Sequence, residues 1–243
     1  MPGLRVQIIG SALAGAAYAV AAWRIGGMPP STCLLAGTLC MLAGLLPDLD
    51  NGDEDALRES VGFAAAVLPL LMIHRLQQAG VSSESIVLVG AMVFLLVRYG
   101  GAWLVDKYSV PRGMFHSLPA AVVAGQVAFL AFSTEEPLHR YFIASAVILG
   151  FLTHLVIDEI WSVKEGHFGP KFKTSFGTAL KFYGPEAWSN LLSYVLVVAL
   201  GVLSAADAHW SEKTLPARQY ARQQMEQAAR SMPTAPVPWN VRR

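Results

Sequence analysis

Seven apolar segments divide the chain and limit what it can fold into more than any other feature. They cover residues 6–23, 32–46, 61–73, 86–105, 118–132, 142–157 and 188–206. A straight helical span needs roughly 20 apolar residues, and lipid admits only structures whose backbone polar groups are paired internally. Several of the segments are shorter than that. The sequence therefore predicts an all-α, polytopic membrane helix bundle with six or seven spans.

Composition supports a membrane protein. Hydrophobic residues make up 54% of the 243 residues and charged residues only 14%, a balance that does not suit the surface of a soluble domain. The formal net charge is +1, and no cluster of Lys and Arg with interleaved aromatic residues occurs, so we expect no nucleic-acid partner. Membrane lipids are the expected partners.

Two regions are expected along the chain. Residues 1–210 form the transmembrane helical domain, and residues 211–243 form a peripheral basic C-terminal tail that is open to a protein partner. The first apolar segment, with Arg5 before it, resembles a signal peptide, but the number of later segments favours a retained span. Lys and Arg residues are more frequent on the side of the polar motifs described below, which favours the cytoplasmic side of the membrane for these motifs.

Small and sulfur-containing residues within the segments are expected to pack helix against helix. Cys33 and Cys40 are the two cysteines, and they share one face of a single segment. A disulfide within one helix at that spacing is geometrically implausible, so both are expected to be packing residues. Small residues let apolar helices approach closely in lipid. The expected contact positions are Gly37, Gly44, Ala64 and Gly150.

Polar residues of the types that bind metals follow the even-numbered segments. They are Asp48 and Asp50 after the second segment, Arg112 and His116 after the fourth, and His154 and Asp158 at the end of the sixth. An even number of crossings returns the chain to the same side of the membrane, so these clusters are expected to meet. His154 and Asp158 stand at i and i+4, which places both on one helix face.

The carboxylates and imidazoles of this group form a candidate metal site. Carboxylate and imidazole ligands together suit Zn, Mn or Fe better than Ca or Mg, and the group has enough ligands for one or two ions. Asp158 is either a direct ligand or a partner that orients His154. A purely structural hydrogen bond between His154 and Asp158 is the alternative, with His116 as an ordinary interfacial residue.

Three motifs taken in order, Leu45–Asp50, Arg112–Ser117 and Gly150–Asp158, resemble those of a known family. This is the bacterial membrane-bound metal-dependent hydrolase family, also called the LexA-binding, inner-membrane-associated hydrolases. The resemblance covers roughly residues 36–183. The second motif in that family often reads His-Arg-Gly, whereas Pro111 precedes Arg112 here. The resemblance implies a helical inner-membrane protein with a metal site and a hydrolase activity.

The function expected from these features is hydrolysis of a lipid-borne ester or phosphoester by a metal-activated water. Asp158 would act at the metal, and Arg112 would clamp a phosphate oxygen. The connection over residues 161–187 is expected to be an interfacial loop or a short surface helix that covers the site, with His167 as a further candidate ligand.

Two other classes of function stay open. One is a non-catalytic membrane protein whose polar residues form a structural or metal-stabilised helix junction and whose tail binds a partner. The other is a transporter with buried acids that relay protons. The absence of charges within the first, third, fifth and seventh segments disfavours a conduction path.

Overall fold

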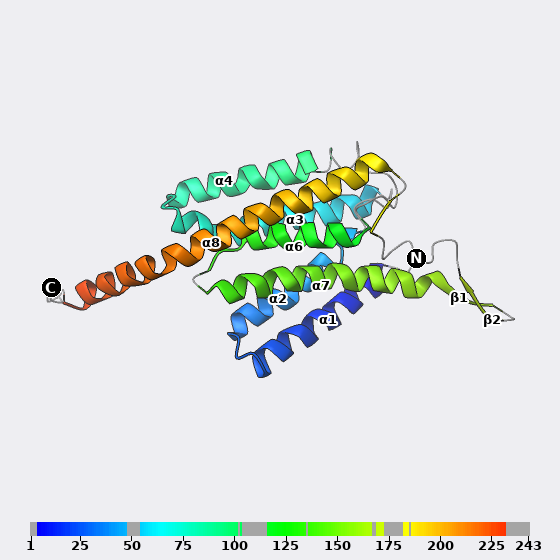
Figure 1. Cartoon of the computed structure of the whole chain (residues 1–243), viewed down its shortest axis with the longest axis horizontal. Coiled ribbons are helices and arrows are strands. Elements are labelled where there is room, and N and C mark those ends of the chain that lie inside the picture. Colours follow the sequence, from blue (N-terminus) through cyan, green and yellow to red (C-terminus); the bar gives the residue numbers. More distant parts are fainter. Residues whose placement is uncertain are drawn as a thin grey trace, which may run out of the picture.

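The computed structural model describes residues 4–47, 54–101, 103, 116–134, 136–166, 169–172, 182–184 and 186–231. Helices dominate these ranges (Figure 1). In chain order the elements are α1 (Leu4–Arg24), α2 (Pro30–Ala43), α3 (Glu54–Gln78), α4 (Ser83–Leu95), the π-helix η2 (Leu96–Gly101), α6 (Leu118–Ala131), α7 (Pro137–Ser162), β1 (Val163–Gly166), β2 (Gly169–Phe172) and α8 (Ala187–Ser231).

The protein is a helical membrane bundle, as the sequence predicts. Each of the seven apolar segments coincides with a helix over most of its described residues. Among the described residues, 4 helices are long and apolar enough to cross a membrane: Arg5–Arg24, Ser83–Gly101, Pro137–Trp161 and Ala187–Ser211. Two further apolar helices, Pro30–Ala43 and Leu118–Ala131, are shorter. The number of six or seven spans stays a prediction.

Helix α7 lies at the centre of the bundle, where it packs against α1, α2 and α6. The main core is made of small and branched residues, among them Ala36, Cys40, Ile143 and Ala146, each fully buried. Cys33 and Cys40 are both buried and carry free thiols. The prediction that they are packing residues is confirmed.

Glycines bring α1, α2 and α7 into backbone contact. A methyl group on Gly150 of α7 would overlap the Cys40 carbonyl of α2, and one on Gly15 of α1 would overlap the Gly37 carbonyl. Only a residue without a side chain fits where two backbones touch in this way. The expected helix contacts at Gly37 and Gly150 are therefore present, and Ala64 lines an apolar cavity between α2, α3, α6 and α7.

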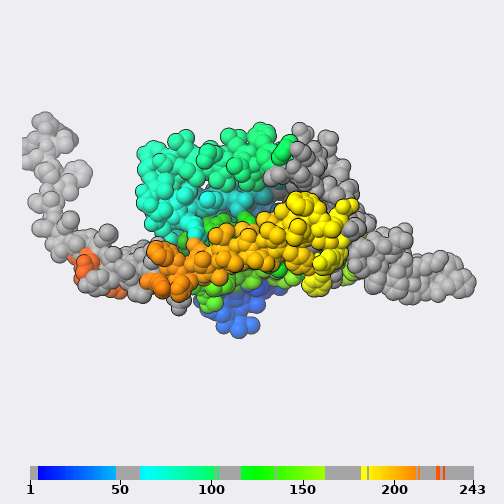
Figure 2. All heavy atoms as spheres, turned by 45° about the horizontal axis from the view of Figure 1, so that its top comes forward, coloured from blue at the N-terminus to red at the C-terminus, as the bar shows by residue number. Residues whose placement is uncertain are grey.

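Helices α4 and α8 form the edges of the bundle. Figure 2 shows α8, yellow to orange, lying along one face, and α4 at the margin. No residue of α4 is buried, and its Val87 and Leu88 side chains are about 70% exposed, as lipid-facing residues are in a helical bundle. Helix α8 has 45 residues and a length of about 68 Å, more than twice a hydrocarbon core, and it runs on past the bundle (Figure 1).

A small hairpin follows α7, where we expected a loop or a surface helix. Strands β1 and β2 are antiparallel, with Val163 opposite Phe172 and Gly166 opposite Gly169. Glycines on both sides of a two-residue connection suit a tight hairpin turn. Over the strands themselves the hairpin takes the place of the expected loop or surface helix, and for the rest of the 161–187 connection that expectation stays a prediction. His167 lies outside the described residues.

Candidate metal centre

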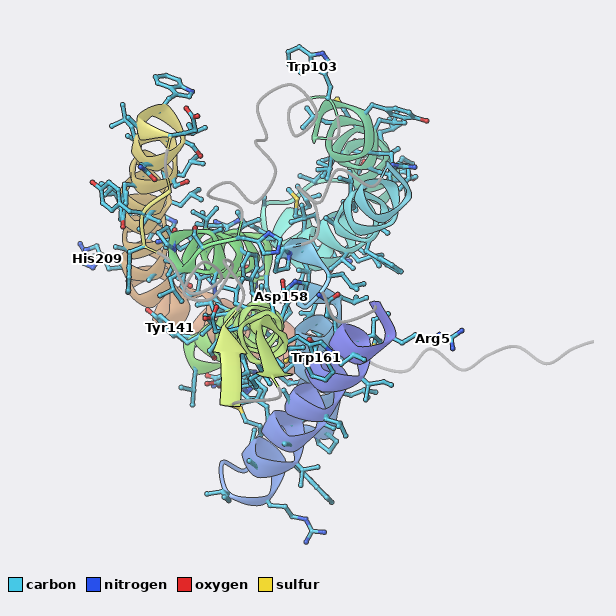
Figure 3. All side chains as sticks on the ribbon, turned by 90° about the vertical axis from the view of Figure 1, so that its right-hand side faces the viewer. Arg5, Trp103, Tyr141, Asp158, Trp161 and His209 are labelled. Atoms are coloured by element: carbon cyan, nitrogen blue, oxygen red, sulfur yellow. The ribbon has the colours of Figure 1, made fainter. Side chains whose placement is uncertain are left out.

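His154 and Asp158 face the interior from the last turns of α7. As their i, i+4 spacing predicts, Asp158 Oδ2 lies 3.7 Å from His154 Nε2. The His154 residue is 0% exposed, and the Asp158 side chain is 12% exposed. Figure 3 shows Asp158 within the bundle, whereas Arg5, Trp103 and His209 lie at its periphery. A carboxylate in such surroundings has to be compensated by hydrogen bonds or positive charge.

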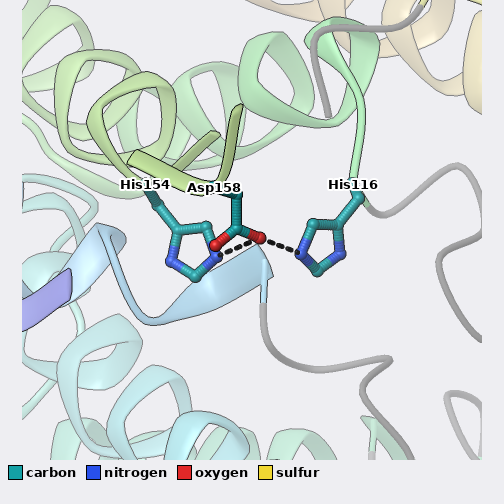
Figure 4. A group of neighbouring side chains, drawn as sticks. All are labelled: His116, His154 and Asp158. Atoms are coloured by element: carbon teal, nitrogen blue, oxygen red, sulfur yellow. Dashed lines mark ion pairs between the residues drawn. The ribbon is translucent and has the colours of Figure 1, made fainter. Parts of the chain in front are cut away.

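His116 reaches the same carboxylate from the start of α6. Its neighbour Ser117 caps this helix, since the Ser117 hydroxyl accepts a hydrogen bond from the Ala120 amide at 3.4 Å. The cap fixes the chain just before the helix and holds His116 at the site. His116 Nε2 lies 3.7 Å from Asp158 Oδ2 (Figure 4). The two imidazole rings lie 5.6 Å apart at 67°.

The Gly44 carbonyl orients His154. His154 Nδ1 lies 2.6 Å from this backbone oxygen, which only accepts hydrogen bonds, so Nδ1 carries the proton and donates it. In the neutral ring, Nε2 then holds the lone pair, and this nitrogen faces Asp158. Gly44 itself is held by a close contact with Ser11 of α1. The end of α2 thus selects the tautomer of a histidine 110 residues later in the chain.

Gln7 of α1 is a member of the site that the sequence analysis missed. Its amide nitrogen lies 3.2 Å from His154 Nε2 and donates to Asp158 Oδ1 at 3.1 Å. Since both partners accept, the amide nitrogen faces them with its two hydrogens. Gln7 is 3% exposed. A lone amide near the start of an apolar segment was the available signal, because polar side chains in lipid-facing helices generally point to a polar partner.

The donor atoms have a spacing that suits a metal ion. One ligand atom from each of His116, His154 and Asp158 lies within 4.8 Å of the other two. Metal–nitrogen and metal–oxygen bonds of about 2.1 Å in a tetrahedral site put neighbouring ligand atoms about 3.4 Å apart. Both histidine–aspartate separations are 3.7 Å, within about 0.3 Å of that value. His154 Nε2 and Asp158 Oδ2 are both acceptors, so a cation between them is electrostatically favoured.

Three predicted site residues, Asp48, Asp50 and Arg112, lie outside the described residues. Of the residues just before Asp48, Gly44 accepts a hydrogen bond from His154, and Pro47 is fully buried. The roles assigned to these three residues stay predictions.

Comparison with known proteins identifies the family of the chain. A family model described as YdjM inner membrane protein matches residues 7–215, a range that includes Gln7 and all three motifs. No curated protein and no solved structure matches the chain. The match covers most of the helical bundle and agrees with its apolar composition. The chain belongs to the YdjM inner membrane protein family.

Proposed function

We propose that the protein is a metal-dependent hydrolase of the inner membrane that acts on a lipid-borne ester or phosphoester. The convergence of His116, His154 and Asp158 on one point is the observation that carries the proposal. Two imidazoles and a carboxylate suit Zn, Mn or Fe, and they leave at least one coordination position open. An ion of this kind, once bound, supplies a water activated for attack near neutral pH.

The protein's own residues have separable tasks in this proposal. His116, His154 and Asp158 hold the ion, and the Gly44 carbonyl keeps His154 Nε2 pointing at it. Asp48 and Asp50 complete the ligand set, because they follow directly on a segment that ends at the site. Arg112, four residues before His116, clamps a phosphate oxygen of the substrate with its planar guanidinium.

An apolar cavity supports a lipid substrate. It has a volume of about 190 Å³, and its lining is almost entirely aliphatic and aromatic. Leu46, next to Pro47 at the end of α2, lines it and also packs on the small apolar cluster around Leu155, the neighbour of His154. Leu46 thus connects the lining of a cavity that suits an alkyl chain with the apolar cluster that contains Leu155. We place the motif side at the cytoplasmic face, in a chain that crosses the membrane several times.

The contacts of Gln7 support a second candidate function, a structural helix junction. The Gln7 amide already donates to His154 Nε2 and Asp158 Oδ1, so the three residues also form a satisfied polar network in the absence of any ion. In that case the site is a structural helix junction, and the C-terminal tail binds a protein partner.

Metal analysis of the detergent-purified protein separates the two functions. If the protein is a hydrolase, it should contain about one or two transition-metal ions per chain. It should also cleave phospholipid substrates, and this cleavage should stop on chelation and return when metal is added. The matched variant is His154→Ala, with the exposed His74→Ala as control. Loss of bound metal in His154→Ala, but not in His74→Ala, supports the metal site. Metal content at background level in the parent protein would refute the proposal and leave the structural junction.

A further inference from the structure

A second polar cluster lies at the opposite end of α7. It contains Arg75 of α3, Arg140 of α7 and Asp207 of α8, and both arginines pair with the one carboxylate. Arg140 stands 18 residues before Asp158 on the same helix, which corresponds to about 27 Å along its axis. That distance is close to the thickness of a hydrocarbon core, so the two polar clusters lie near opposite membrane faces.

Part of this cluster holds the end of α6. Arg140 donates to the Phe132 carbonyl at 3.2 Å and to the Phe129 carbonyl at 3.1 Å, while Arg75 donates to the Leu130 carbonyl at 2.7 Å. The last carbonyls of a helix lack partners within it and carry partial negative charge, which explains why two cations lie there. This structural role uses Nε and Nη2 of Arg140 and Nη1 of Arg75.

The cluster nevertheless has an excess of positive charge. Two guanidinium groups face one carboxylate, and the Arg140 side chain is only 3% exposed. Among the residues that the structure describes, Asp207 is the one acidic side chain that lines the space beside them, a cavity of about 190 Å³. Its lining residues are Arg75, Gln78, Ala79, Ser133, Arg140, Asp207, Trp210 and Ser211. Within the described part of the chain, Nη1 of Arg140 and Nε of Arg75 donate to no protein acceptor.

We propose that this cavity binds a phosphate group. A buried cation in excess is costly unless an anion compensates it, and guanidinium groups bind phosphate oxygens with paired N–H donors. Trp210 lines the cavity and is 65% exposed, as is usual for an indole at the membrane–water interface. The phosphate comes either from the headgroup of an anionic lipid or from free phosphate. The site is independent of the candidate metal centre.

Arg75→Gln is the principal test, since Arg75 is 35% exposed and its loss perturbs the fold less than that of Arg140. The control is Arg24→Gln, which removes one exposed cation from the same end of the bundle. Two probes are used: inorganic phosphate with lipid-free protein in detergent, read as a shift in melting temperature, and nanodiscs of phosphatidylglycerol in phosphatidylcholine, read as retained lipid. Losing a charge-assisted hydrogen bond should weaken binding about tenfold or more in Arg75→Gln, but not in the control.

Asp207→Asn keeps the proposal testable if Arg75→Gln unfolds. This variant removes the competing carboxylate, so phosphate affinity should rise, whereas a purely structural cluster would lose stability and gain no ligand. Retention of phosphatidylglycerol without a response to inorganic phosphate identifies the lipid headgroup as the source. A response to inorganic phosphate without lipid preference identifies free phosphate. No Arg75-dependent binding of either probe overturns the proposal.

Discussion

Asp158→Asn tests the candidate metal centre most directly. The amide has nearly the same size as the carboxylate, and its Oδ1 still accepts the hydrogen bond from Gln7. The substitution therefore removes one negative charge and replaces Oδ2, the oxygen that faces both histidines, with an NH2 group that only donates. What that charge does depends on whether Asp158 binds the metal itself or only orients His154.

The geometry decides between these two roles. An orienting carboxylate accepts a hydrogen bond from the histidine nitrogen that faces away from the metal, and such partners change metal affinity by about 10- to 100-fold. That nitrogen, Nδ1 of His154, already donates to the Gly44 carbonyl at 2.6 Å. Asp158 instead lies beside the lone-pair nitrogen Nε2. Asp158 is therefore expected to be a direct ligand. Asp158→Asn should then lower the metal affinity by more than 100-fold, or about 2.7 kcal/mol of binding free energy.

Competition with a chromogenic zinc chelator in detergent measures the dissociation constants of the parent protein and the variant. Glu159→Gln is the matched control, because it removes the same charge from the adjacent residue, which points about 100° away around the helix. The zinc affinity of Glu159→Gln should stay within about threefold of that of the parent protein. An Asp158→Asn metal affinity within about 100-fold of the parent would show that the carboxylate is not a ligand and that the inference from His154 is wrong.

Further predictions concern the site and its support. Asp48→Ala should lose bound metal and yet remain membrane-inserted, as judged by metal analysis and membrane extraction, because insertion depends on the apolar spans. Arg112→Lys should lower turnover on a phosphoester with unchanged metal content, since lysine lacks the planar fork. Metal affinity should fall as the pH is lowered, because bound imidazoles must be deprotonated; a pH-independent affinity would contradict histidine ligation. Gly150→Ala should destabilise the protein by about 1–3 kcal/mol through overlap with the Cys40 carbonyl. Thermal unfolding checks this last prediction against Gly62→Ala, whose added methyl group meets nothing within 4 Å.

Periodic and compositional features made much of the fold predictable. Apolar segments mark the helices because lipid-facing helices need continuous apolar surface, and the i, i+4 spacing of His154 and Asp158 places them on one face before any tertiary contact is known. Counting crossings was enough to expect His116 at the same end of the bundle. The structure brings these three side chains together.

Long-range contacts were not predictable in the same way. Gln7 lies 147 residues from His154, and no local spacing links an amide on α1 to a histidine on α7. Asp207 and Arg140 likewise pair across 67 residues. The last apolar segment of the sequence ends at Ala206, directly before Asp207, although the helix continues to Ser231. Helix ends are poorly marked when the polar tail that follows is itself a good helix former.

The Gly44 carbonyl has a consequence for mutagenesis of this site. A carbonyl oxygen belongs to the peptide bond, so every residue type at position 44 would present the same acceptor to His154. No side-chain replacement removes this oxygen. A substitution at position 44 would affect the protein mainly because the new side chain crowds Ser11. The tautomer of His154 is thus determined by how closely three helices pack. Replacing the amide that follows Gly44 with an ester, by chemical ligation or nonsense suppression, would weaken that acceptor while leaving the neighbouring side chains unchanged.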